Sequence, residues 1–248
     1  MLGIIGGSGL THLANLEITH RQVIRTPYGE PSGALTFGNI NGHEVVFLAR
    51  HGYGHTIPPH LVNYRANLWA LQSEGAQDIV SVATVGGIHA QLVPGNIVIP
   101  DQIIDYTHGR KHTFHDSTDQ AVTHIDFTEP YSQRMRELCM RAAGEIGEGY
   151  LDGGVYAAVQ GPRLESAAEI NRLERDGATM VGMTGMPEAG LARELDLNYA
   201  AICAVANSAA GRASSTHGIR YHEVETVLDE AMQRVRRIIE QIVVIHGG

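Results

Sequence analysis

The chain begins Met1-Leu2-Gly3-Ile4-Ile5-Gly6-Gly7-Ser8-Gly9, an apolar run that leads into a glycine turn. Such a run is typical of a buried strand, and a glycine turn directly after it lets backbone N–H groups and the Ser8 hydroxyl converge on an anion. Taken alone, the stretch is equally compatible with a phosphate site and with a turn whose glycines serve packing. It is not a dinucleotide-binding fingerprint, because His12 stands where a third glycine is required, and the Gly-Lys-Ser/Thr of a P-loop is absent.

From this first strand onward, short β-branched runs alternate with segments of helical periodicity. The alternation predicts an α/β fold with a mixed or parallel sheet covered on both faces, in which ligands bind beyond the carboxyl ends of the strands. One helix should open with a capping box, Ser166-Ala-Ala-Glu169. The expected strands are 2–5, 45–48, 78–82, 96–99, 155–159, 180–182 and 199–205, and the expected helices are 61–74, 130–146, 166–176, 188–195 and an apolar stripe over 224–242.

The composition limits the possible partners. The 248 residues include 18 Lys and Arg against 27 Asp and Glu, a net charge of −9, which gives no overall attraction to nucleic acid or to an anionic membrane. Two cysteines, Cys139 and Cys203, are too few for a disulfide framework, and neither a signal peptide nor a membrane-spanning run is evident. We therefore expect a cytoplasmic protein with one domain over residues 1–248.

Histidines suggest a metal site, but their pattern argues against one. His51 and His55 are four residues apart, and others cluster with Asp116 in a polar stretch, residues 106–128, that we interpret as a long insertion loop. The chain has no His-Glu-x-x-His pattern, and a solvated loop accounts for the cluster, so no metal is expected. A serine hydrolase is unsupported because no Gly-x-Ser-x-Gly occurs.

Other candidates stand where strands should end. Arg50 and His51 follow an apolar run and form a second possible anion site, unless Arg50 neutralises a nearby carboxylate instead. Asn207 also follows an apolar run, where its carboxamide could both donate to and accept from a heterocycle or could simply form a turn.

Together, six stretches in this order resemble the purine nucleoside phosphorylase superfamily, and within it the methylthioadenosine phosphorylase branch. The resemblance covers nearly the whole chain and implies a single α/β domain with a central mixed β-sheet flanked by helices. The stretches are Gly3-Ile-Ile-Gly-Gly-Ser-Gly9, Arg50-His-Gly-Tyr-Gly-His-Thr-Ile57, Val62-Asn-Tyr-Arg-Ala-Asn-Leu-Trp-Ala-Leu71, Pro94-Gly-Asn-Ile-Val-Ile-Pro-Asp-Gln102, Gly161-Pro-Arg163 and Met183-Thr-Gly-Met-Pro-Glu188.

The resemblance implies phosphorolysis, in which inorganic phosphate attacks the anomeric carbon of a purine nucleoside without a metal or an organic cofactor. Phosphate is then a co-substrate. Met183 would contact the ribose through packing and its backbone. His51 and Asn207 are the expected catalytic residues, Asn207 by hydrogen-bonding the departing base. The residues expected to hold phosphate are Ser8, Arg50, His51, Thr84 and Thr184.

The resemblance also bears on the rest of the substrate. His55 would lie near the 5′ substituent, and His124 would reach the pocket of a neighbouring subunit, which implies a homotrimer. Relatives that cleave methylthioadenosine have Thr, Asp and Asp at the base site, whereas this chain has Ala206, Asn207 and Ala209. Asn can donate to O6 and accept from N7–H, which favours a 6-oxopurine.

A methylthio-type 5′ site and an oxopurine base site together make S-methyl-5′-thioinosine the expected nucleoside. Several alternatives remain open within and beyond this activity. The chain could act on methylthioadenosine, act generally on inosine and guanosine, use water instead of phosphate, or bind nucleosides without catalysis.

Overall fold

The first strand, β1 (Leu2–Gly6), lies inside a sheet, between β4 (His43–Ala49) and β5 (Asp78–Gly87), and is parallel to both. This arrangement is seen in a computed structural model that describes residues 1–119 and 121–248, except the side chains at positions 221 and 223. Every residue of β1 is buried. An interior parallel strand is covered on both faces, which explains the uninterrupted apolar run at the start of the chain.

The other strands extend this sheet in both directions. They are β2 (Glu17–Gln22), β3 (Leu35–Ile40), β6 (Ile97–Ile99), β7 (Gln102–Asp105), β8 (Leu151–Asp152), β9 (Val155–Ala158), β10 (Met180–Gly182) and β11 (Asn198–Ser208). The order along the sheet is β2-β3-β4-β1-β5-β10-β9-β7, while β11 pairs with β5 and β6, and β6 pairs with β8. Because β5 is parallel to β11 and antiparallel to β10, the sheet is mixed, as predicted.

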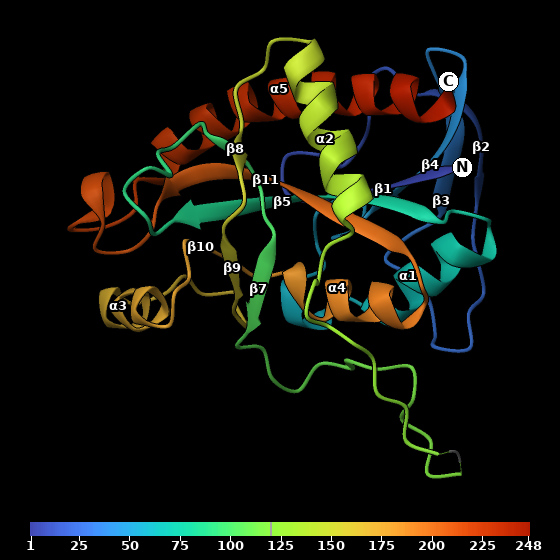
Figure 1. Cartoon of the computed structure of the whole chain (residues 1–248), viewed down its shortest axis with the longest axis horizontal. Coiled ribbons are helices and arrows are strands. Elements are labelled where there is room, and N and C mark those ends of the chain that lie inside the picture. The colour runs from blue at the N-terminus through green and yellow to red at the C-terminus, as the bar shows by residue number, and fades with distance from the viewer. Residues whose placement is uncertain (120) are drawn as a thin grey trace.

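Helices cover both faces of the sheet (Figure 1). They are α1 (Tyr64–Ser73), α2 (Gln133–Glu145), α3 (Ala167–Arg175), α4 (Gly185–Glu194) and α5 (Tyr221–Gly247), with short 3₁₀ turns at Pro59–Leu61 and Ala213–Ser215. Helices α2 and α5 pack with one set of strand side chains, and α1 and α4 pack with the opposite set. The two resulting apolar layers hold the sheet rigid, so the loops at its strand ends have a fixed base.

The predicted elements agree with the observed ones apart from their ends, and the α/β class is confirmed. The capping box is present, because Ser166 accepts from the Glu169 N–H and the Glu169 side chain accepts from the Ser166 N–H. Strands β2, β3, β7 and β8 were not predicted. Strand β2 is exposed along its whole length and carries no apolar alternation that would reveal it.

Residues 106–128 form no helix or strand in their described part, as predicted. The segment leaves the body of the molecule after β7 and returns at α2 (Figure 1). Its first part is held down, because Arg65 of α1 pairs with Asp116 at 2.8 Å and Glu194 of α4 accepts from Thr113 and from the Phe114 N–H. Among the described residues, no helix combines the length and the apolar character that crossing a bilayer requires.

Candidate active site

A cavity of about 630 Å³ opens where several strands end. It is bordered by the turn after β1, the residues after β4, the end of β5, and the ends of β10 and β11, with α5 closing one side. The residues brought together there from the sequence prediction are Ser8, Arg50, His51, His55, Thr84, Met183, Thr184 and Asn207. Ala209 and His124 are not among them.

The glycine turn after β1 serves both packing and the cavity. A side chain at Gly7 would lie 2.5 Å from the Val82 carbonyl oxygen and 2.9 Å from Nη1 of Arg50, so only glycine lets the turn pack this closely. Ser8 lines the cavity, its Oγ lies 3.4 Å from Nε2 of His55, and its carbonyl accepts from the Thr84 hydroxyl at 3.3 Å. The turn therefore places Ser8 and Thr84 side by side at the cavity wall.

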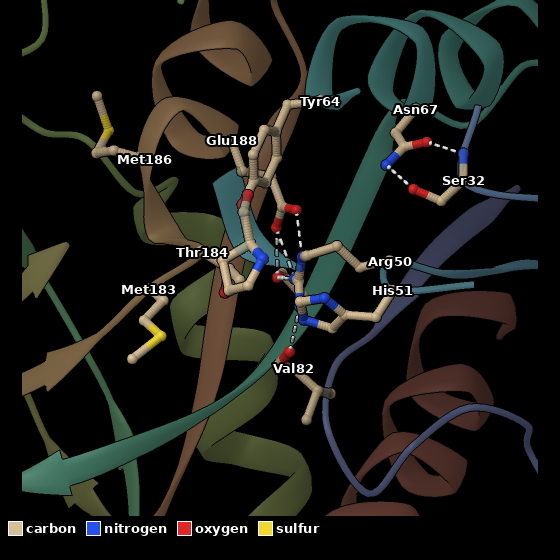
Figure 2. A network of polar contacts seen from close by, with 12 residues as sticks. Ser32, Arg50, His51, Tyr64, Asn67, Val82, Met183, Thr184, Met186 and Glu188 are labelled. Carbon is tan, nitrogen blue, oxygen red and sulfur yellow. Dashed lines mark hydrogen bonds and ion pairs between the residues drawn. The ribbon is translucent and has the colours of Figure 1, made fainter. Parts of the chain in front are cut away.

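Arg50 is a fully buried guanidinium paired with a buried carboxylate. Its Nε and Nη2 donate to the two carboxylate oxygens of Glu188 at 2.6 and 2.8 Å (Figure 2). Nη2 also donates to Ser81 Oγ at 2.5 Å. Tyr199 donates to the same carboxylate at 2.8 Å. The sequence did not identify Glu188 as the partner, because it lies 138 residues further along the chain.

Charge pairing explains how both groups stay ionised. Burial alone would raise the pKa of Glu188, but the Arg50 charge and the hydrogen bonds it receives hold that pKa below its usual value. Burial would likewise lower the pKa of Arg50, yet Glu188 raises it. Nη1 donates one hydrogen to the Val82 carbonyl at 3.0 Å. Of the five N–H hydrogens of the guanidinium, one on Nη1 is thus left for an anion in the cavity.

His51 is held as a neutral imidazole. Its Nδ1 lies 2.8 Å from the Ile57 carbonyl oxygen, which can only accept, so Nδ1 must carry the proton and Nε2 has a free lone pair. Burial and the neighbouring Arg50 charge lower the pKa of His51 to about 4. At neutral pH the ring is therefore a hydrogen-bond acceptor, which suits the hydroxyl of monohydrogen phosphate or of a sugar.

Asn207 reaches the cavity because β11 is irregular there. The pairing of β11 with β5 shifts register between Val205 and Asn207, and both Ala206 and Asn207 line the cavity. Successive residues of a regular strand face opposite ways, and a bulge removes that restriction. Asn207 Nδ2 donates to the Ser208 carbonyl at 2.7 Å, so its Oδ1 and its second hydrogen remain for a ligand. Ala209, beyond the bulge, is buried in an apolar cluster instead, so the structure gives it no place in the cavity.

Glu165 is a cavity residue that sequence reasoning missed. It follows the Gly161-Pro-Arg163 stretch after β9, lines the cavity together with Asn207, and is half-buried. Burial raises the pKa of its carboxyl group. The capping box could have indicated its position in the sequence, because Glu165 directly precedes Ser166, the first residue of that box, and is therefore held close to the strand end.

An apolar wall also borders the cavity. Ile219 precedes α5, and Val224 and Leu228 lie on the first turns of that helix, all three half-buried. Gly9 packs against the same helix, because a side chain there would lie 2.8 Å from Cγ of Met232. The sequence indicated an apolar α5 but could not show which of its residues face the ligand.

His124 lies elsewhere. It is exposed in the 106–128 segment and does not line the cavity of its own chain, so its expected role in a neighbouring subunit stays a prediction. In the described part of the chain, no group of three or more His, Cys, Asp or Glu side chains is arranged to hold a metal ion.

Known proteins share this fold and sequence. The chain is 51% identical over 239 residues to a probable S-methyl-5′-thioinosine phosphorylase of Pseudomonas syringae pv. tomato, with 96% of each chain covered. It is 41% identical over 243 residues to the 6-oxopurine nucleoside phosphorylase of Pyrococcus furiosus, covering 96% of this chain and 90% of that one.

A solved structure of a nucleoside phosphorylase is similar to the chain as well. Methylthioadenosine phosphorylase from Schistosoma mansoni in complex with adenine superposes with a TM-score of 0.93 at 31% identity, covering 99% of this chain and 91% of the other. The profile of the phosphorylase superfamily matches residues 1–244. With the strand-end cavity and its paired Arg50 in place, this match establishes that the chain belongs to the phosphorylase superfamily.

Proposed function

We propose that this chain catalyses the phosphorolysis of S-methyl-5′-thioinosine, releasing hypoxanthine and 5-methylthioribose 1-phosphate. The observation that carries the proposal is that one cavity joins an anion site, a base site with one amide and one carboxyl group, and an apolar wall. Each of these matches one part of the two substrates. The similarity to the Pseudomonas syringae protein supports the same reaction.

Phosphate would be held by the residues at the ends of β1, β4 and β5. Ser8 and Thr84 can donate from their hydroxyls, Arg50 from its remaining Nη1 hydrogen, and neutral His51 can accept the phosphate O–H. Thr184, at the end of β10, would complete the set. No metal or organic cofactor is part of the proposal.

The bound phosphate would also stabilise the transition state. As the glycosidic bond lengthens, positive charge develops on the ribosyl ring, and an oxyanion held next to it stabilises that charge. Met183 would position the ring from the end of β10. The bond to N9 breaks with its electron pair staying on the base, and the bond from a phosphate oxygen to the anomeric carbon forms. The proton that monohydrogen phosphate loses balances the one that the base takes up to leave as neutral hypoxanthine, and no covalent enzyme intermediate is needed.

The base site favours an oxopurine. Asn207 can donate to O6 and accept from N7–H, while the Glu165 carboxylate can accept from N1–H. Adenine presents a lone pair at N1 and would require Glu165 to be protonated. A mismatched polar contact in a buried site costs about 1–3 kcal/mol, which is roughly 5- to 150-fold in specificity.

The 5′ site favours a substituent without a hydroxyl. A methylthio group gains free energy by leaving water for the wall of Ile219, Val224 and Leu228. His55 is exposed at the same cavity and could instead bond a 5′-hydroxyl, which supports inosine as a second substrate. The similarity to the Pyrococcus furiosus protein points the same way.

Turnover of methylthioinosine, inosine and methylthioadenosine, each with and without phosphate, tests the proposal when both products are identified by mass spectrometry. We expect methylthioinosine to give the highest kcat/KM and no turnover without phosphate. Base release in water alone would make the protein a nucleosidase, and binding without release would make it a non-catalytic receptor. A preference for methylthioadenosine would overturn the base assignment.

We also propose a cytoplasmic homotrimer in which His124 completes a neighbouring site. Apolar side chains flank it on the protruding segment, Val122 being 80% exposed and Ile125 37% exposed. Exposed apolar groups of this size gain from burial against a second copy of the chain.

A further inference from the structure

Arg110 is a buried guanidinium whose partners are mainly carbonyl groups of the main chain. It is 8% exposed, although it belongs to the polar segment after β7. Nη1 donates to the carbonyls of Met183 at 2.8 Å and Met186 at 2.7 Å, and Nη2 donates to those of Gln160 at 2.8 Å and Val159 at 3.2 Å.

Side chains complete the surroundings of this guanidinium. Nε donates to Oε1 of Gln160 at 3.2 Å, Nη1 lies 3.2 Å from the Tyr64 hydroxyl, and the charge lies 5.6 Å from the centre of the Tyr64 ring. No carboxylate forms an ion pair with Arg110 among the residues of ranges 1–119 and 121–248. Carbonyl dipoles therefore stabilise the charge, and the charge in turn fixes where those carbonyls point.

The four carbonyls belong to the ends of β9 and β10 and to the first turn of α4, and of the four residues Met183 lines the cavity. Val159 and Gln160 follow β9 and lead within five residues to Glu165, and Met183 follows β10. Met186 interrupts the first turn of α4 with φ −120° and ψ 141°, a conformation outside the helical region. Arg110 bonds the Met186 carbonyl at this break, after which α4 continues to Glu188, the partner of Arg50.

We propose that Arg110 is a positioning residue for nucleoside binding, which holds the Met183 and Gln160 strand ends at the separation that the sugar and base require. The proposal rests on the proposed function for the identity of the ligand. A planar fork with donors on both sides spans the two strand ends, which a single ammonium group cannot do. Of the proposed phosphate residues, Ser8, His51 and Thr84 lie on elements that Arg110 does not contact, and only Thr184 directly follows one of its partners, Met183. Phosphate binding should therefore depend on Arg110 far less than nucleoside binding does.

The test compares Arg110→Lys and Arg110→Met with Arg136→Lys and Arg136→Met. Arg136 is the control, because it is 7% exposed and also donates to main-chain carbonyls, of Pro100 at 3.0 Å and Ile99 at 3.4 Å. It differs from Arg110 in also pairing with Asp152, and none of these partners lines the cavity. Measurements are kcat and KM for methylthioinosine, the Kd of hypoxanthine and of inorganic phosphate by calorimetry, and the melting temperature.

We expect both Arg110 variants to raise the nucleoside KM and the hypoxanthine Kd by about tenfold or more, as for the loss of a well-placed hydrogen bond. The phosphate Kd should stay within about threefold of wild type. The Lys variant should not restore nucleoside binding, even if it restores the melting temperature. The Arg136 variants should lower only the melting temperature.

Three results would overturn the proposal. They are a hypoxanthine Kd within about threefold of wild type in folded Arg110 variants, an equal loss in the Arg136 variants, or full rescue by Lys. Failure of the proposed function looks different, because wild-type protein would then bind hypoxanthine without releasing it from any nucleoside. The Kd comparison among the variants still decides the role of Arg110 in that case.

Discussion

The imidazole of His51 connects the chemistry of the site to the stability of the fold. Its pKa falls from 6.5 in an unfolded chain to about 4 in the folded one, so the folded state binds fewer protons between these values. This contribution to stability is present above pH 6.5 and is lost as the pH falls through about 4. For a group that is only 6% exposed, it amounts to about 3 kcal/mol.

The variant His51→Asn keeps a donor near the Ile57 carbonyl but does not titrate. We therefore expect the free energy of unfolding to depend less on pH in the variant, by about 3 kcal/mol between pH 7 and pH 4. Denaturant titrations of both proteins across this range measure the difference. Parallel pH profiles would show that His51 titrates normally in the folded protein.

At the base site, Asn207→Asp should shift the preference toward 6-amino purines. A protonated carboxyl can donate to N7 of the leaving base, and a carboxylate oxygen can accept from the exocyclic amine. The ratio of kcat/KM for methylthioadenosine to that for methylthioinosine should rise by roughly 5- to 150-fold. Asn171→Asp, the same change at an exposed position, is the control and should leave this ratio unchanged. An unchanged ratio in the Asn207 variant as well would remove Asn207 from base recognition.

At the scale of single elements, the residues at the start of α3 hold the stretch before that helix, which carries the cavity residue Glu165, in place. Ser166 and Glu169 bond each other's backbone N–H groups, and Arg163 pairs with Glu169 at 2.8 Å. Hydrogen bonding from Arg163 and the N–H of Ser166 lowers the pKa of Glu169 to about 2. The stretch between β9 and α3, which carries Glu165, is thus fastened at its helix end.

Ser166→Ala should lower the free energy of unfolding by about 1 kcal/mol, the usual cost of removing a helix cap. Ser132→Ala at the start of α2 is the comparison, since Ser132 accepts one bond at 3.4 Å without a reciprocal partner. We expect the Ser132 variant to lose less stability in chemical denaturation. Equal losses would mean that the reciprocal bond in α3 contributes nothing.

The sequence predicts those elements whose own residues form an apolar pattern typical of burial. The β1, β5 and β11 runs are apolar because both sheet faces are covered, and the glycine turn follows directly from β1. Strand β2 and the partners of Arg50 and Arg110 lack such a signal. Glu188 contacts Arg50 only once the chain has folded. The groups that bond Arg110 are main-chain carbonyls, which every residue has, so the residue types do not reveal them.

For the whole molecule, the protruding segment predicts association. A trimer of chains of 26.8 kDa should have a mass of about 80 kDa in light scattering. Val122→Asp should shift the protein toward the monomer and lower kcat/KM, because His124 would leave the neighbouring site. Val93→Asp, at another exposed apolar position with 51% exposure, should change neither. A wild-type monomer with full activity would contradict this assembly.

The irregular pairing of β11 separates the role of the backbone in the proposed base site from the role of the side chains. The backbone there turns two adjacent positions, Ala206 and Asn207, toward the cavity. Under the proposed function, their side chains would determine which purine edge is recognised. Point substitutions at these positions can alter nucleobase choice and leave the hydrogen-bond ladder of the sheet untouched. Under the proposed function, substrate range would thereby be an easily mutable trait of an otherwise unchanged scaffold, open to natural divergence and to laboratory selection alike.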